Sequence, residues 1–262
     1  MRIAMISALA LACAGAAHAG AIATNTEASP PADAASGVTT INIDVGTLDA
    51  RDPDAGSKAA LRAAAALIQK GQPQLALVFL DKLIAEFETR YGTSSKQVFC
   101  AHAQAEAVLY MGMAAAAKKD AIALDGTYCD AYFLRGFAKV DLLRPDEAEA
   151  DYARALALAP NNPHYLSEMG ELHASRRDWD GALAFFHRAE DAAPTCSPPG
   201  QDKAELARAL RGIGYSDVEL GRLDEAEALY RRCLEIDAGD EKARNELVYV
   251  LNLKAQQAGV TN

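Results

Sequence analysis

Residues that could carry catalytic chemistry are few in this 262-residue sequence. The chain contains no Gly-rich phosphate loop, no G-x-S-x-G nucleophile turn, no H-E-x-x-H metal motif and no C-x-x-C redox motif. Glu168 and Glu171 are three residues apart, a spacing that places two carboxylates on one helix face and could support general acid and base catalysis. A solvated helix face explains the pair more simply. We therefore expect no catalytic residue, no cofactor and no enzymatic activity, with an enzyme of unrecognised site as the remote alternative.

The histidines do not stand at the spacing of a metal site. Beyond residue 19, His102, His164 and His187 are spread over different predicted helices with no ligand spacing, and His173 stands at an aromatic packing position of the repeat described below, which favours a core role. We therefore expect no bound metal.

A repeat of 34 residues sets the elements that position these side chains. Residues 129–162 and 163–196 share six positions at one fixed offset: Tyr132, Gly136, Ala148, Tyr152, Ala155 and Pro160 in the first, and Leu166, Gly170, Ala182, Phe186, Ala189 and Pro194 in the second. The glycine and the alanine lack bulky side chains, so the two helices of each unit can cross closely there. The aromatic residue one turn after the alanine then packs beside the crossing.

This pattern resembles the tetratricopeptide repeat, a helix-turn-helix unit of 34 residues. The resemblance implies an all-α fold, a right-handed α-solenoid of about five units with a C-terminal capping helix. The expected units are 57–90, 95–128, 129–162, 163–196 and 207–240, followed by the cap at 241–257. In both clear units the last aromatic residue of the family pattern is replaced, by Lys139 and by His173, so the packing at that position must differ.

The N-terminus is typical of an exported protein. Arg2 precedes an apolar stretch, and Ala17-His18-Ala19 has the form that signal peptidase recognises, so we expect residues 1–19 to be a signal peptide cleaved after Ala19 and the mature chain to be periplasmic. An uncleaved anchor is one alternative. Lipidation at Cys13, which would make an outer-membrane lipoprotein, is another.

Residues 20–56 are poor in large apolar side chains and indicate a flexible tether. Within them, Val38–Val45 is the one stretch that we expect to favour a strand. It would lie against the first helices or, alternatively, add as a strand to a partner.

The charge balance limits the classes of partner. The chain has 26 basic and 36 acidic residues, a formal net charge of -10, and its basic residues do not cluster beyond pairs. This balance argues against nucleic acid and against an anionic membrane surface. We expect a membrane contact only if Cys13 is lipidated or the signal is not cleaved.

Four cysteines remain after cleavage: Cys100, Cys129, Cys196 and Cys233. In a solenoid each unit touches only its neighbours, so if two disulfides form, the expected pairs are Cys100 with Cys129 and Cys196 with Cys233. Alternatively the cysteines are small buried side chains. Cys233 stands where the clear units have alanine, which is a core position.

The resemblance also implies where a ligand would bind. In this family the first helices of successive units line a concave groove, which places there Phe99, Phe133, Phe137, His164, Glu168, Glu171, Arg208, Arg211 and Tyr215. Phe133 and Phe137 are candidate anchors for a partner segment, or else pack against the adjacent unit. Arg208 and Arg211 could hold a carboxylate.

The leading hypothesis is a non-enzymatic protein-interaction module that binds a peptide or helix of a partner in this groove. The alternative is an envelope or pilus assembly lipoprotein anchored through Cys13. Family members that clamp the acidic C-termini of chaperones use Lys and Asn in the groove, and this chain has other residues at those positions, so we do not expect that ligand.

Overall fold

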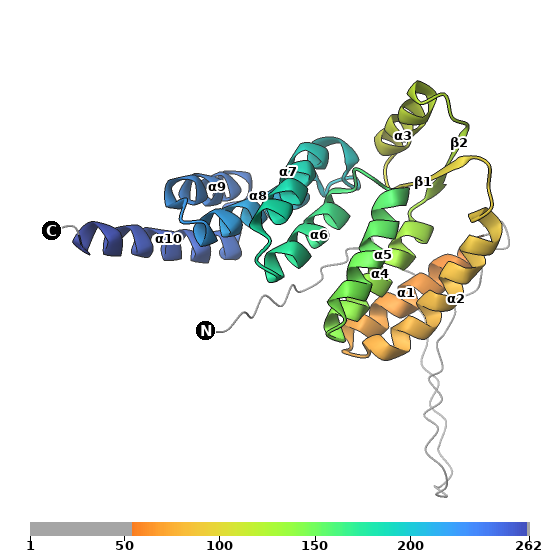
Figure 1. Ribbon diagram of the computed structural model, residues 1–262, viewed down its shortest axis with the longest axis horizontal. Helices are drawn as coiled ribbons and strands as arrows, with labels where there is room; N and C mark the ends of the chain where they lie inside the picture. Colours follow the sequence, from red (N-terminus) through yellow and green to blue (C-terminus); the bar gives the residue numbers. More distant parts are fainter. Residues whose placement is uncertain (1–53, 261–262) are drawn as a thin grey trace, which may run out of the picture. The chain divides into compact units, whose positions relative to one another are not determined.

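The computed structural model describes residues 54–260, which form ten helices and two strands (Figure 1). Eight helices form four antiparallel pairs, and each pair packs on the next. The pairs are α1 (Ala55–Gln69) with α2 (Pro73–Tyr91), α4 (Thr127–Asp141) with α5 (Pro145–Leu158), α6 (Pro163–Ser175) with α7 (Trp179–Cys196), and α8 (Asp202–Glu219) with α9 (Leu223–Ile236). Helix α10 (Glu241–Val260) covers α9. The expected all-α solenoid with a C-terminal capping helix is therefore confirmed.

The expected unit at 95–128 is wrong. The structure has a strand, a helix and a strand there: β1 (Gln97–Ala101), α3 (Gln104–Ala116) and β2 (Ala121–Asp125). The two strands pair in parallel, with Gln97 opposite Ala121 and Ala101 opposite Asp125, and α3 makes the crossover between them. We call residues 96–125 the insertion. The solenoid thus has four helix pairs within the described residues, and Val38–Val45 lies outside the residues that the structure describes.

The glycines of the repeat allow the close helix crossings that the pattern predicts. A Cβ atom on Gly136 would lie 2.6 Å from the ring of Tyr152, and one on Gly170 would lie 2.8 Å from the ring of Phe186. Both rings are buried. Each ring therefore occupies the space that the glycine leaves open, which fixes the crossing of the two helices.

The two polar replacements of the family pattern each contact a carboxylate on, or directly before, the second helix of their unit. The Nζ atom of Lys139 lies 2.7 Å from Asp151 Oδ2, and His173 Nδ1 lies 2.6 Å from Asp178 Oδ2. Asp178 also caps α7 by accepting from the backbone N–H of Gly181. An ion pair thus takes the place of the aromatic residue at Lys139, whereas His173 combines its polar contact with ring packing against Phe185, at 5.1 Å between ring centroids.

A buried hydrogen-bond network joins the insertion to the helix pairs. His102 directly follows β1, and its Nε2 lies 3.1 Å from Asp130 Oδ1 on α4 while its Nδ1 lies 3.2 Å from the side chain of Asn162. Glu106 of α3 accepts from the backbone N–H of His102 at 2.6 Å and from the hydroxyl of Tyr110 at 2.7 Å. Burial lowers the pKa of His102, but Asp130 and Cys129 more than offset it, so the pKa lies well above its ordinary value.

The four cysteines of the described residues are buried and carry free thiols in this structure. Burial and the adjacent thiol of Cys100 raise the pKa of Cys129 well above its ordinary value, so these two cysteines lie close to each other, and the predicted disulfide between them stays a prediction. Cys196 and Cys233 have separate surroundings, Glu106 near the first and Arg211 with Asp240 near the second, which does not support the second predicted pair. Cys233 is fully buried, as its position in the repeat predicts.

No helix among residues 54–260 combines the length and apolar character needed to cross a bilayer.

Candidate functional site

Five polar side chains meet where α6 packs against α8, and we call them the α6–α8 cluster: His164, Glu168, Glu171, Glu205 and Arg208. The α6 members stand four and three residues apart, so they lie on one helix face, and the two α8 members are three residues apart. Helices α6 and α8 are in direct contact, which brings the two faces together. The cluster is therefore a product of two successive first helices, as the repeat predicts.

Arg208 is the centre of the cluster. Its Nη2 donates to Glu168 Oε1 and, at 3.1 Å, to Glu171 Oε1, while its Nη1 lies 3.1 Å from Nδ1 of His164. That Nδ1 atom lies 3.0 Å from Glu205 Oε1. One guanidinium thus holds two carboxylates directly, while Nδ1 of His164 either accepts from Arg208 or donates to Glu205, depending on which ring nitrogen carries the proton.

Burial and charge act in opposite directions on the members of the cluster. Burial raises the pKa of Glu168, and the attraction of Arg208 does not fully reverse this. At Glu205 burial also acts to raise the pKa, but His164 and Arg208 outweigh it and the net pKa is lowered. Burial lowers the pKa of Arg208, and the surrounding carboxylates more than compensate, so the guanidinium stays charged. The five side chains of the cluster comprise three carboxylates and one guanidinium, and the guanidinium of Arg211 also acts to lower the pKa of Glu205.

Three polar atoms in this region are buried without a hydrogen-bond partner among the described residues: Ser167 Oγ, Glu205 Oε2 and Arg208 Nε. The Glu205 side chain is only 10% exposed and that of Glu168 7%, whereas Glu171 is 34% exposed. Glu171 is therefore the carboxylate that an external ligand reaches most easily.

Phe133 is not an exposed anchor. It is 2% exposed and stacks on Tyr152, with ring centroids 5.7 Å apart, and on Tyr165 of the next unit at 4.9 Å. Its ring also meets the imidazole of His164 edge-on at 5.0 Å. Packing against the adjacent unit, the alternative that the sequence left open, is thus the correct interpretation for Phe133. Phe137 is half-buried beside it, with ring centroids 6.5 Å apart, and stays a candidate contact.

Of the other predicted groove residues, Arg211 is close enough to the α6–α8 cluster to help lower the pKa of Glu205, whereas Phe99 and Tyr215 pack against other aromatic rings. Phe99 is buried on β1 and stacks on Tyr110 at 5.1 Å, so it belongs to the core of the insertion. Arg211 forms an ion pair with Asp240 and lines a hollow of about 700 Å³ between the start of α8 and the turn before α10. Tyr215 is half-buried against Trp179, with ring centroids 5.9 Å apart. Arg208 and Arg211 are both paired with carboxylates of the protein, so each would have to give up such a partner to hold a ligand carboxylate.

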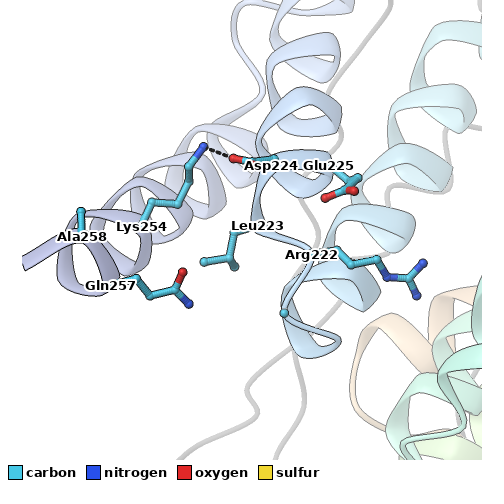
Figure 2. A pocket seen from close by; sticks show the side chains of 8 residues that line it. Arg222, Leu223, Asp224, Glu225, Lys254, Gln257 and Ala258 are labelled. Atoms are coloured by element: carbon cyan, nitrogen blue, oxygen red, sulfur yellow. Dashed lines mark ion pairs between the residues drawn. The ribbon is translucent and has the colours of Figure 1, made fainter. Parts of the chain in front are cut away.

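A second hollow, of about 330 Å³, lies where the turn between α8 and α9 meets the end of α10 (Figure 2). Lys254 forms ion pairs there with Asp224 and with Glu227, the latter at 2.7 Å. Figure 2 shows the ammonium of Lys254 directed at Asp224, while the guanidinium of Arg222 extends to the opposite side. None of the predicted site residues lines this hollow.

Glu205 is the functional candidate that the sequence interpretation missed. It precedes the position at which the repeat phase resumes, after the loop that begins near Ser197. The sequence does place Glu205 three residues before Arg208, and this spacing indicates that the two side chains share one face of a helix.

Comparison with known proteins agrees with this architecture. Sequence profiles of the tetratricopeptide repeat match residues 130–162 and 162–238. The mouse (Mus musculus) RNA polymerase II-associated protein 3 is 28% identical over 121 residues, which are 45% of this chain and 18% of that protein. The chain thus spans about a fifth of the length of this curated relative.

Two solved structures have the same fold. The Pseudomonas aeruginosa protein PilF superimposes with a TM-score of 0.55 at 15% identity, over 78% of this chain and 71% of that one. BtubC from P. vanneervenii superimposes with a TM-score of 0.51 at 17% identity, over 71% of this chain and 65% of that one. The 34-residue repeat, the stacked helix pairs and the matching profiles lead to one conclusion: residues 130–238 consist of repeats of the tetratricopeptide family.

Proposed function

We propose that this protein is a non-enzymatic protein-interaction module whose groove, lined by α4, α6 and α8, binds a partner segment that carries a basic side chain. One observation carries the proposal: in the α6–α8 cluster three carboxylates face one guanidinium, and Glu171 is the exposed member. A lysine or arginine of a ligand would offset this excess of negative charge, whereas a ligand carboxylate would increase it. Phe137, half-buried nearby, would supply an apolar contact to the same segment.

The test compares two helical peptides of equal length, one with lysines and one with glutamates at matched positions beside leucines, in a fluorescence anisotropy titration. The lysine peptide should bind and the glutamate peptide should not. Glu171→Gln should weaken the binding of the lysine peptide by about fivefold, as expected for the loss of one partly exposed ion pair.

Glu149→Gln is the matched control. Glu149 lies on α5, a second helix, where its side chain is 37% exposed and pairs with Arg176, so it resembles Glu171 in exposure and pairing. Preference for the glutamate peptide, or equal loss in both variants, would refute the groove assignment. Phe133→Ala is not a suitable probe, because the ring is part of the core.

Export to the periplasm is part of the proposal and depends on residues 1–19. Mass spectrometry of the mature chain from fractionated cells tests it, since cleavage after Ala19 gives an N-terminus at Gly20. A mature chain that begins with a lipid-modified Cys13 would instead favour an anchored envelope assembly protein.

A further inference from the structure

Helix α3 exposes apolar side chains around most of its circumference. It buries one stripe, Glu106, Tyr110 and Ala114, and contacts β1, β2 and α7. Every other residue from 107 to 117 is apolar or glycine, and four large side chains are 37–66% exposed: Val108, Leu109, Met111 and Met113. In Figure 1, α3 lies beside the two strands and outside the stack of helix pairs. Apolar side chains exposed on the outer sides of a helix mark a surface that interacts with another protein or with a membrane.

Three lysines stand at the edge of the insertion where α3 ends. The strands are parallel and Gln97 lies opposite Ala121, so Lys96 before β1 and Lys118 and Lys119 before β2 share this edge. Lys118 adopts a left-handed conformation (φ 55°) that ends α3. All three lysines are exposed, and none forms an ion pair with another residue of the 54–260 region.

This local charge differs from that of the whole chain. Asp120 is the exposed carboxylate at the same edge, while Glu106 is buried and Asp125, at the other edge, forms an ion pair with Lys58. The net charge of -10 of the whole chain predicts no affinity for an anionic surface, but the insertion does not share it, because its three lysines balance Glu106, Asp120 and Asp125. One edge of the insertion is positive and borders an apolar helix.

We propose that α3 together with Lys96, Lys118 and Lys119 forms a docking surface for an anionic lipid bilayer. The apolar side chains of α3 enter the boundary between headgroups and acyl chains, and the lysines contact lipid phosphates. A protein groove would cover one side of α3, whereas a fluid apolar phase covers all its outward sides at once. The negative charge of the helix pairs keeps the remainder of the molecule away from the same membrane.

The test is co-sedimentation of the full-length chain with vesicles of phosphatidylcholine alone or mixed with phosphatidylglycerol, at low and high salt. The parent should bind the mixed vesicles, and salt should release it. Lys118→Gln with Lys119→Gln should weaken partitioning by roughly 25-fold, which is about fivefold for each charge. Val108→Gln with Met111→Gln and Met113→Gln should abolish it.

The matched control places glutamine at exposed apolar positions outside the insertion, Val78, Leu143 and Val248, which are 66%, 88% and 53% exposed. This triple variant should bind vesicles like the parent. Amide hydrogen exchange then locates the contact, since vesicles should slow exchange within α3 and leave α9 unchanged.

Three results would overturn the proposal: no preference for anionic vesicles, equal binding by both triple variants, or vesicle binding without protection of α3. A dimer that is lost only in the α3 triple variant, without lipid binding, would assign the surface to a second copy of the chain instead.

Discussion

The ring of Phe186 is held between two glycines, and this arrangement gives a stability prediction of definite sign. A Cβ atom on Gly170 of α6 would lie 2.8 Å from Phe186 Cδ1, and one on Gly212 of α8 would lie closer still to the same ring. Phe186 is 2% exposed, so it has no free space to enter. Substitution of either glycine by alanine therefore forces α7 away from α6 or α8.

Two opposing contributions decide the magnitude. Alanine in a helix interior is favoured over glycine by up to about 1 kcal/mol. Overpacking a filled core costs about 1–3 kcal/mol. We expect Gly170→Ala and Gly212→Ala each to lower the free energy of unfolding by about 1–2 kcal/mol. The double variant should lose more than the sum, because the ring can no longer move from one helix toward the other.

Gly112→Ala is the matched control. Gly112 lies within α3, and a Cβ atom there would meet no atom within 4 Å. Only the helix-propensity gain applies, so this variant should be more stable by about 0.5–1 kcal/mol.

Urea unfolding followed by circular dichroism measures all four variants. The fluorescence of Trp179, the single tryptophan, reports the contact of α7 with α8 because its ring lies 5.9 Å from that of Tyr215. If Gly212→Ala were as stabilising as Gly112→Ala, the assignment of Phe186 as a filled core position between two units would be wrong.

Three further predictions concern the polar groups. Arg208→Ala should lower the free energy of unfolding by about 3 kcal/mol in urea titrations, because it leaves Glu168 buried without its guanidinium. Because the pKa of His102 is raised in the folded state, its charged form contributes stability that is fully present below pH 6.5 and is lost as the pH rises through the folded pKa. The difference in the free energy of unfolding between the parent and His102→Gln should therefore shrink as the pH rises. Peptide mapping after oxidised glutathione treatment should find Cys100 bonded to Cys129, and two free thiols there would exclude the predicted pair.

The repeat could be predicted from the sequence because its requirements are local. Gly136 and Tyr152 stand at a fixed spacing within one unit, and the space that the glycine leaves is filled by a ring of the same unit. The same holds for Gly170 and Phe186. A third pair of the same kind, Gly214 with Tyr230, follows in the next unit, so the period itself reveals these contacts.

The insertion could not be predicted in this way. Ala114 and Ala121 fit the small positions of a repeat, but a small residue is equally compatible with a strand or with a buried helix stripe. The strands Gln97–Ala101 and Ala121–Asp125 are five residues long, and each is stabilised by the other, 24 positions away in register. A pairing between distant short segments leaves no periodic signal.

Phe133 shows why a groove cannot be fully read from repeat positions, and what recognition in this groove must depend on. Its position in the repeat assigns Phe133 to the groove face, but Tyr165 of the next unit covers its ring. The repeat pattern of one unit does not predict which side chain of the next unit will cover a given position. With Phe133 in the core and Phe99 in the insertion, Phe137 is the phenylalanine predicted for the groove that a ligand can still contact. The area available for apolar burial is then small, so the proposed selectivity rests on the charged groups of α6 and α8. Because Arg208 is already held by Glu168 and Glu171, we expect these groups to present an anionic surface to a ligand.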